Sequence, residues 1–350
     1  MKRTKILSLI MATVMVFTLA TGCSKSAENQ KTEAPKGEVD TTQAETPASE
    51  DAKEEVVSKY NITVNEEDVT FTDATGEEVT IKKNPQKVVC LYNSYLDLWD
   101  ICGGTVIGRV EESVEKPVEN ALSAEGVGTA SSPSLEKVLA LQPDLVIVTT
   151  SFSGQKEMIP TLKQNNIQVI ALDNDYIDDY YETVKLFTAL TGKEELYEKN
   201  VTEVKKSVEE IIEEVPTDKN YKVLLMFASA KSLSVRDSES MVGEMLADLN
   251  TVNISDTEMK SSDSKTFSME KIIQEDPDYI FVLTMGNDVQ KIMERLKQDA
   301  EDNPAWASLT AVKEGRYIVL PKNLYMYKPN NRYAEAYEGL AKILYPEVFK

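Results

Sequence analysis

The sequence predicts an α/β protein built from two lobes that one long helix joins. Strands and helices alternate after residue 58, a pattern that favours parallel sheets covered by helices. One strand-and-helix unit occurs twice, most clearly as "SLEKVLALQPDLVIV" over residues 134–148 and "SMEKIIQEDPDYIFV" over residues 268–282. We therefore expect a first lobe over residues 58–183, a connecting helix over 184–218 and a second lobe over 219–350.

Residues 1–22 have the pattern of an export signal. Lys2, Arg3 and Lys5 precede an apolar run from Ile6 to Leu19, which is too short to span a bilayer comfortably. Small residues then lead to Cys23, as in a bacterial lipobox, so we expect Cys23 to be lipidated and to anchor the exported protein to the membrane. The alternative is an ordinary secretory signal with an incidental cysteine.

Residues 23–57 have the composition of a flexible tether. From residue 24 to 57 there is no aromatic residue, leucine, isoleucine or methionine. Such a segment cannot bury enough apolar surface to offset its chain entropy. We expect it to hold the folded lobes away from the membrane.

Each half then repeats the same order of elements. Apolar runs predict strands, and Ser134 and Ser268 stand where helix N-caps are expected. Pro-Asp follows each of these helices and stops it before a buried strand. The strands expected in this way cover residues 88–91, 106–108, 145–148, 222–227 and 279–283.

The stretch over residues 180–215 has apolar residues at helical spacing, first Val184, Phe187 and Leu190 and then a Glu/Lys-rich part. Pro216 ends it. Its place between the two copies favours one rigid helix joining the lobes, and a surface helix within one lobe is the alternative.

Charge and composition exclude several functions. The net charge is −21, which makes nucleic acid an unfavourable partner. Histidine is absent, which excludes Ser–His or Cys–His catalysis and a histidine-based metal site, so we expect no resident metal. Cys90 and Cys102 are expected to be buried free thiols, with a disulfide as the alternative.

Several segments, in order, resemble the iron-chelate and vitamin B12 class of periplasmic binding proteins. These are "VTFTDATGEEVTIKKNPQKVVCL", "SLEKVLALQPDLVIV", "DSESMVGEMLADLNTVNI" and "NPAWASLTAVKEGRYIVLP" followed by "RYAEAYEGLAKILYPE". The resemblance covers residues 69–347 and implies a class III periplasmic-binding-protein fold, with two Rossmann-like lobes and a ligand cleft between them. It also implies an ABC permease and ATPase as membrane partners, a monomer, and no cofactor beyond the transported chelate.

Ligands of parallel α/β lobes meet the loops that follow the carboxyl ends of the strands. The loops expected here cover residues 92–95, 109–113, 149–154, 228–238, 284–287 and 321–332. An anionic chelate needs flat apolar faces and fixed cations, and arginine presents a planar fork suited to oxyanions. Only six arginines occur in the chain, and three of them fall in these loops. The candidate ligand-binding residues are Tyr92, Tyr95, Arg109, Phe152, Arg236, Tyr325, Tyr327 and Arg332.

These arginines have a second interpretation. Arg109 and Arg236 can instead pair with a local carboxylate such as Glu111 or Asp237, and Arg332 begins a helix and can simply pack there. The resemblance further implies that a surface glutamate on each lobe docks onto the permease. Glu157 is the candidate on the first lobe, and Asp288 or Glu294 on the second.

The sequence thus predicts reversible capture of a ferric siderophore, without catalysis, and its delivery to the importer. Haem is the first rival ligand, with Tyr92, Tyr327 or Met326 as axial ligand, and a corrinoid is the second. An exported enzyme or a surface adhesion protein is the rival of another class. No nucleophile–base motif supports an enzyme, and adhesion does not require the loop arginines.

Overall fold

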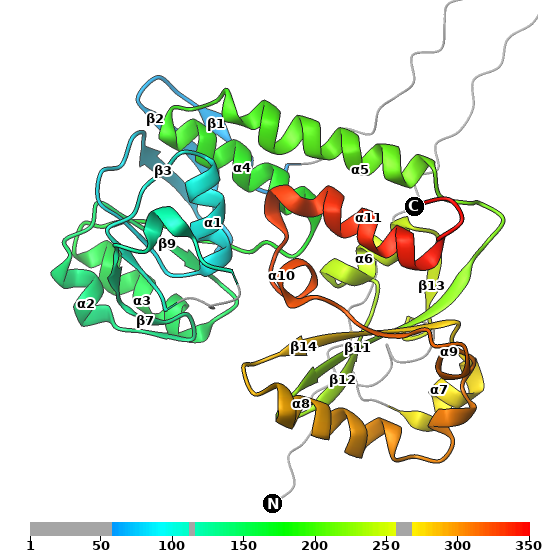
Figure 1. The fold of residues 1–350 in the computed structure, drawn as a ribbon. Helices are drawn as coiled ribbons and strands as arrows, with labels where there is room; N and C mark the ends of the chain where they lie inside the picture. The colour runs from blue at the N-terminus through cyan, green and yellow to red at the C-terminus, as the bar shows by residue number, and fades with distance from the viewer. Residues whose placement is uncertain (1–57, 112–115, 257–267) are drawn as a thin grey trace, which may run out of the picture. The chain divides into compact units, whose positions relative to one another are not determined.

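The computed structural model describes residues 58–111, 116–256 and 268–350, and residues 55–350 form one compact unit. The expected signal, Cys23 and the tether lie outside the described residues. Across the described ranges, every helix is too short or too polar to cross a bilayer. Figure 1 shows two α/β lobes, each with its own sheet.

A small antiparallel sheet opens the first lobe. Its strands are β1 (Thr63–Val64), β2 (Asp68–Thr72) and β3 (Glu78–Lys82). Val69, Phe71 and Ile81 alternate with more exposed residues and are buried. The turn between β2 and β3 is closed by Asp73, whose Oδ1 accepts from the Thr75 N–H at 2.8 Å, and by Gly76 at φ +82°.

The main sheet of the first lobe is parallel, in the order β10-β9-β4-β5-β6. Its strands are β4 (Val88–Cys90), β5 (Gly108–Arg109), β6 (Glu125–Gly126), β9 (Leu145–Thr149) and β10 (Gln168–Leu172). A short ribbon, β7 (Gly128–Thr129) with β8 (Ser132–Pro133), lies beside it. The helices are α1 (Asn93–Ile101), α2 (Leu135–Ala140), α3 (Ser153–Gln164) and α4 (Ile177–Thr191).

Both faces of this sheet are buried, as its apolar strands predict. Val88, Cys90 and Ile147 point into the core shared with α1 and α4. Val89 and Val146, on the opposite face, pack with α2 and α3.

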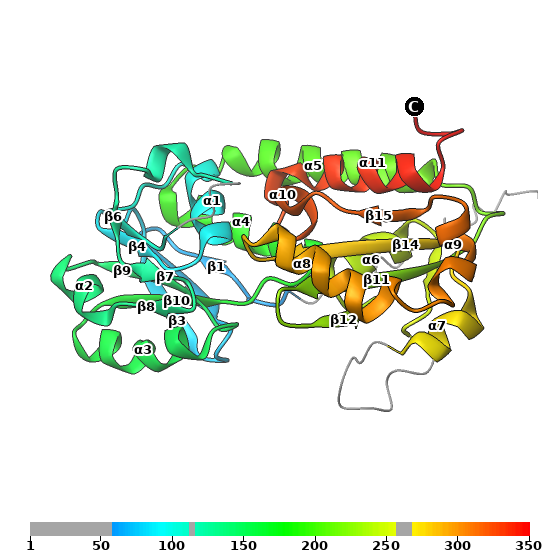
Figure 2. The same cartoon turned by 60° about the horizontal axis from the view of Figure 1, so that its bottom comes forward.

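The second lobe has its own sheet, in the order β12-β11-β14-β15, with β13 beside the start of β11. Its strands are β11 (Tyr221–Ser229), β12 (Leu233–Arg236), β13 (Thr251–Asn253), β14 (Tyr279–Met285) and β15 (Tyr317–Val319). Its helices are α6 (Met241–Asp248), α7 (Met269–Glu275), α8 (Val289–Leu296), α9 (Thr310–Lys313), α10 (Lys322–Tyr325) and α11 (Tyr333–Leu344). Helices α6 and α11 cover one face, and α7, α8 and α9 the other (Figure 2).

One strand of this sheet differs from the predicted parallel pattern. The segment expected to be a loop over residues 228–238 contains β12, which pairs antiparallel with β11. A tight turn makes this possible, because the Ser229 N–H donates to the Ser232 carbonyl at 2.9 Å. The hairpin brings Arg236 back beside Leu225 of β11.

The duplicated Pro-Asp has the same structural task in both lobes. Asp144 accepts hydrogen bonds from the backbone N–H groups of Gln86 and Lys87, at 2.8 and 3.0 Å, just before β4. Asp278 accepts from the Lys222 N–H at 2.8 Å, at the start of β11. In each lobe the aspartate therefore fixes the first core strand beside the strand that it precedes.

The predicted connecting helix over residues 184–218 is wrong at its start. Helix α4 ends at Thr191, because Gly192 adopts a left-handed conformation with φ +65°. Val184, Phe187 and Leu190 belong to α4 and are buried in the first-lobe core. A second helix follows as a π-helical segment (Glu198–Thr202) and α5 (Glu203–Glu213).

Helix α5 runs beside α11, as both ribbon views show (Figures 1 and 2). Val204 and Val208 of α5 and Leu340 of α11 share one apolar core with residues of both lobes. This shared core, and not the long helix alone, joins the lobes.

Cys90 and Cys102 are both buried free thiols, which confirms the prediction. Burial raises the pKa of the Cys90 thiol to about 12. Such a thiol stays protonated and unreactive at neutral pH.

Candidate ligand-binding cleft

A cleft of about 440 Å³ lies where the two lobes face each other. The first lobe contributes Ser151, which follows β9, and Asp175, which follows β10. All the other lining residues belong to the second lobe: Phe227, Arg236, Ser240, Met241, Val242, Leu283, Tyr325, Met326 and Lys328. The cleft thus forms at the carboxyl ends of parallel strands, as expected.

Apolar side chains form one part of the cleft lining. Phe227 and Leu283 are neighbours in the β11–β14 register. Met241 and Val242 come from the first turn of α6, and Met326 follows α10. These surfaces suit the apolar body of a small organic ligand.

Arg236 is the fixed cation of this lining. Its guanidinium carbon lies 4.1 Å from the centre of the Phe227 ring, and its Nη1 donates to the Ser234 hydroxyl at 3.2 Å. Burial lowers the pKa of the Arg236 guanidinium below its usual value, although arginine remains charged at neutral pH. Stacking on Phe227 holds the planar guanidinium of Arg236 in one orientation before a ligand binds.

Lys328 provides a second positive charge. Its Nζ lies 3.4 Å from Asp175 Oδ1, and its side chain is 18% exposed whereas that of Asp175 is 60% exposed. Burial lowers the pKa of the Lys328 ammonium, and the Asp175 carboxylate opposes this shift. The Lys328 carbonyl accepts from Lys116 Nζ at 2.7 Å, which ties the backbone of this residue to the first lobe.

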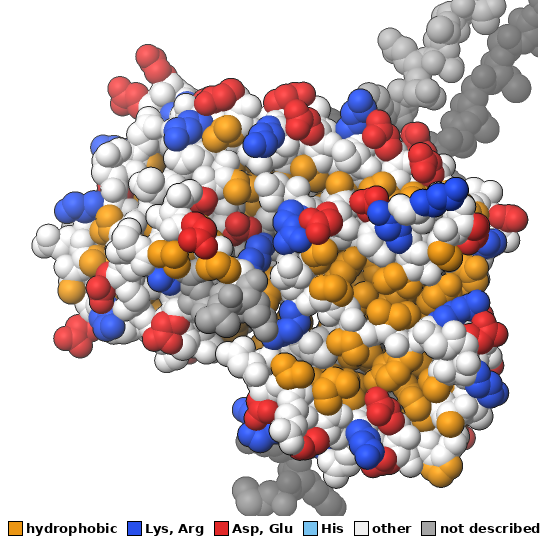
Figure 3. Space-filling model, viewed as in Figure 1, with side chains coloured by type: hydrophobic (Ala, Val, Ile, Leu, Met, Phe, Trp, Pro, Cys, Tyr) orange, Lys and Arg blue, Asp and Glu red, His pale blue; other side chains and the backbone are white. Residues whose placement is uncertain are grey.

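Several Lys and Arg side chains lie near the centre of the face shown in Figure 3. Across the described ranges, no group of three Cys, Asp or Glu side chains is arranged to hold a metal ion. The cleft lining offers two cations, Arg236 and Lys328, and apolar surface.

The predicted aromatic residues of the first lobe form a cluster of their own. Tyr92 packs edge-on against Tyr95 and Phe152, with ring centres 5.0 and 6.1 Å apart. Tyr95 is buried in the core, and burial raises its pKa and that of Tyr92. These three side chains are not among the residues that line the described cleft.

Arg109 lies on β5, and its guanidinium donates to main-chain carbonyls. Nε donates to the Ala121 carbonyl at 2.8 Å and Nη2 to that of Leu122 at 3.4 Å. These bonds hold the main chain at residues 121 and 122, and Arg109 does not line the described cleft.

The remaining predicted residues follow α10. Tyr325 lines the cleft, and its hydroxyl donates to the Ala336 carbonyl at 2.9 Å. Tyr327 lies near Lys322, whose Nζ is 6.0 Å from its ring centre. Arg332 is partly exposed and pairs with both carboxylate oxygens of Glu335 at 2.7 and 2.8 Å, so its described contacts are local.

The predicted docking residues are exposed on separate lobes. Glu157 lies on α3 and Glu294 on α8, where its carboxylate accepts from Gln290 Nε2 at 2.9 Å. The alternative, Asp288, is the N-cap of α8 and pairs with Lys291 at 2.6 Å, so it has a structural task.

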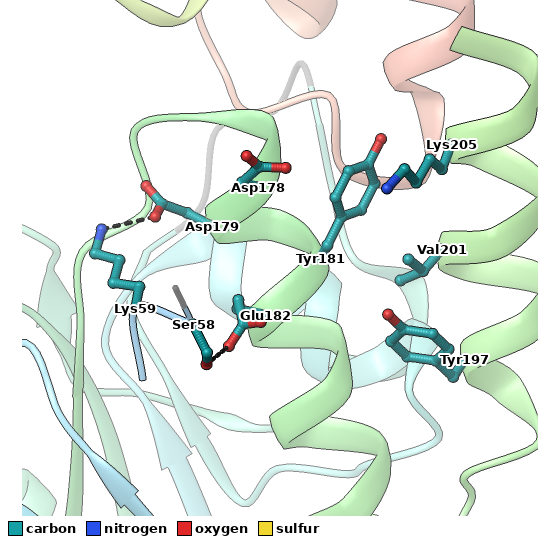
Figure 4. Close-up of a pocket in the computed structure, with 9 residues that line it drawn as sticks. All are labelled: Ser58, Lys59, Asp178, Asp179, Tyr181, Glu182, Tyr197, Val201 and Lys205. Carbon is teal, nitrogen blue, oxygen red and sulfur yellow. Dashed lines mark hydrogen bonds and ion pairs between the residues drawn. The ribbon is translucent and has the colours of Figure 1, made fainter. Parts of the chain in front are cut away.

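A second hollow of about 240 Å³ lies between α4 and the helix that includes α5 (Figure 4). Two pairs of its polar groups are bonded to each other. Lys59 Nζ lies 2.8 Å from Asp179 Oδ1, and the Ser58 hydroxyl donates to Glu182 at 2.5 Å. These contacts fix residues 58 and 59 to α4, and we assign this hollow a structural role.

The sequence profile of the periplasmic binding protein family matches residues 88–324 of the chain. The chain belongs to this family. The match spans both lobes and all the cleft-lining residues except Tyr325, Met326 and Lys328.

This periplasmic binding protein is also similar to individual proteins, two of them named as binding proteins. The Fe(3+)-citrate-binding protein YfmC of Bacillus subtilis is 28% identical over 68% of this chain and 74% of its own length. The uncharacterized ABC transporter substrate-binding lipoprotein YvrC of the same organism is 26% identical over 81% of this chain and 87% of its own length. The crystal structure of Staphylococcus aureus SirA complexed with staphyloferrin B superposes with a TM-score of 0.65, covers 79% of this chain and 98% of SirA, and is 20% identical, so it shows the shared fold.

Asp175 and Lys328 of this periplasmic binding protein were not among the residues predicted from the sequence. Asp175 follows the strand over residues 168–172, whose carboxyl end also faces the cleft, and that strand was not among those predicted. Lys328 lies within the predicted loop over 321–332, but the chain has many lysines and none stands out by type. The pairing of Lys328 with Asp175 depends on how the two lobes meet, which no local pattern contains.

Proposed function

We propose that this periplasmic binding protein is the extracytoplasmic substrate-binding component of an ABC importer and that it captures an anionic ferric chelate. The observation that carries the proposal is the cleft in which Arg236 and Lys328 stand beside the apolar side chains of Phe227, Leu283 and Met241. Ferric complexes of carboxylate or catecholate ligands combine negative charge with an organic surface, and this lining complements both. Relatives named for Fe(3+)-citrate and for ABC transport support the assignment.

Capture and release need no catalytic group. The chelate binds between the lobes, held by the Arg236 fork and the Lys328 ammonium, while the apolar side chains exclude water from its organic part. The loaded protein, a monomer, then docks on the permease and ATPase complex through Glu157 and Glu294. Lipidation of Cys23 and the tether over residues 23–57 keep it near that complex.

Titration of the purified full chain tests this proposal. Ferric citrate, a ferric trihydroxamate, a ferric catecholate, haemin and cyanocobalamin are added while tryptophan and tyrosine emission and the visible spectrum are recorded. We expect saturable quenching by a ferric chelate at about micromolar concentration or below. Binding of haemin or cyanocobalamin alone, with no response to any ferric chelate, would overturn the proposed ligand class.

A further inference from the structure

The ligand cleft contains a carboxylate that an anion-binding site does not need. Asp175 lines it together with Arg236 and Lys328, so the three side chains leave one net positive charge. The Asp175 carboxylate is the more exposed partner of the pair with Lys328, at 60% against 18%. Its negative charge therefore faces the space that a ligand enters.

The pair also joins the two lobes. Asp175 follows β10 of the first lobe, whereas Lys328 follows α10 of the second. At 3.4 Å the contact is longer than a tight charge-assisted hydrogen bond, so the ammonium keeps capacity for another partner. An anionic group of a ligand that reaches Lys328 must compete with Asp175 for it.

The groups around Lys328 make the competition between Asp175 and a ligand depend on the charge of the ligand. Lys328 is largely removed from water, which strengthens its electrostatic interactions. Asp173 adds a further carboxylate near the pair, whereas the neighbouring Asp179 is already neutralised by Lys59 at 2.8 Å. A ligand with several negative charges is thus repelled by Asp175 and Asp173 while two cations attract it.

We propose that Asp175 determines specificity by acting as a charge filter, which fits the cleft to ferric chelates of low net negative charge and disfavours polyanionic ones. This inference rests on the proposed function. A ligand that carries an ammonium group gains a direct partner in Asp175, and a neutral ligand is affected little.

Substitution Asp175→Asn removes the charge and keeps the shape. Three probes of different charge are titrated into the full chain: ferric citrate, which is polyanionic; ferrichrome, a neutral trihydroxamate; and ferrioxamine B, whose ammonium group makes it cationic. We expect the affinity for ferric citrate to rise about three- to tenfold and that for ferrioxamine B to fall by a similar factor. Ferrichrome affinity should change less than about twofold, and the changes for the charged probes should shrink at high salt.

The matched control is Asp178→Asn, which removes the same charge three residues further on, where the side chain lines the separate hollow shown in Figure 4. It should leave all three affinities within about twofold. If the wild-type protein shows no measurable binding of ferric citrate, measurable binding of ferric citrate by the Asp175→Asn variant is the expected result.

Three outcomes are distinguishable. Opposite shifts for the anionic and cationic probes support the charge filter. Shifts of the same sign for every probe, or no gain for ferric citrate, overturn it and leave the proposed function standing. Failure of the wild-type protein to bind any ferric chelate overturns the proposed function itself. Melting temperatures of all variants establish that each is folded.

Discussion

At Arg236 the guanidinium lies 4.1 Å from the Phe227 ring and faces the cleft, whereas at Arg109 the same group donates to the carbonyls of Ala121 and Leu122. The sequence predicts that both residues lie near strand ends, because strand and loop positions follow from local patterns. The sequence alone does not predict which arginine donates to main-chain carbonyls, because residues 121 and 122 come close to β5 only in the folded lobe. Residue type therefore predicts that each arginine can bind an oxyanion. The tertiary structure determines whether its guanidinium faces the cleft or donates to main-chain carbonyls.

Removing the cleft cation should weaken binding strongly. In Arg236→Ala the anionic chelate loses its ordered two-point partner, and we expect at least about a tenfold loss of affinity for ferric citrate. Arg332→Ala is the matched control, because Arg332 pairs with Glu335 and does not line the described cleft. Calorimetric titration of both variants checks this, and equal losses in the two would contradict the role given to Arg236.

At the scale of elements, the duplicated helix and strand were predictable because both copies have an N-cap serine, a Pro-Asp stop and a buried strand. The Ser134 hydroxyl accepts from the Lys137 N–H at 3.3 Å, so the expected cap is present there, whereas Ser268 is the N-cap residue of α7 without a side-chain cap bond. The break between α4 and α5 was missed, although Gly192 is a known C-terminal signal. Helical spacing continues on both sides of Gly192, and the pattern on its own does not show that the axis changes direction.

The contact between α6 and α4 should make stability depend on pH. Glu244 of α6 accepts from the Ile177 N–H at 3.4 Å, and burial, together with Asp248 of α6 and Asp178 and Asp179 of α4, raises its pKa to about 7. Because the folded state holds this proton more tightly than the unfolded state, the stability that Glu244 contributes is present at low pH. It is lost as pH rises from the unfolded pKa to about 7.

Glu244→Gln should therefore stabilise the protein above pH 7, on the order of 1 kcal/mol after allowance for its partial exposure, and should flatten the pH dependence. Glu210→Gln is the control, because Glu210 is exposed and paired with Lys206 on α5. Urea unfolding at pH 5.5 and pH 8 measures both. If the wild-type protein is more stable at pH 8 than at pH 5.5, and Glu244→Gln removes this gain, the assignment is contradicted.

At the scale of the whole molecule, the two lobes were predictable from the internal repeat, and the connection between them was not. Residues from both lobes, α5 and α11 share one apolar core, which includes Val208 and Leu340. Such a core needs contacts between residues far apart in the chain, which single-sequence patterns do not encode. The position of the cleft was predictable, because ligands of parallel α/β lobes bind at the carboxyl ends of the strands. The pairing of Asp175 with Lys328 was not, because it depends on how the shared core holds the two lobes together.

Docking on the permease should depend on acidic side chains that chelate binding does not use. Glu157→Ala combined with Glu294→Ala should leave chelate affinity unchanged, because both side chains are exposed outside the cleft, and should slow uptake about tenfold or more. Uptake of labelled ferric chelate by cells that carry these substitutions measures the effect. Glu209→Ala with Glu213→Ala on α5 removes the same charge and should have little effect.

The most direct measurement is a crystal structure of the protein with a bound ferric chelate, chosen as the tightest ligand in the titrations. We expect the iron complex between the lobes, with its anionic oxygens within hydrogen-bonding distance of Arg236 and Lys328. A complex bound elsewhere, for example in the hollow beside α4, or held without either cation, would contradict the assignment of this cleft as the ligand site.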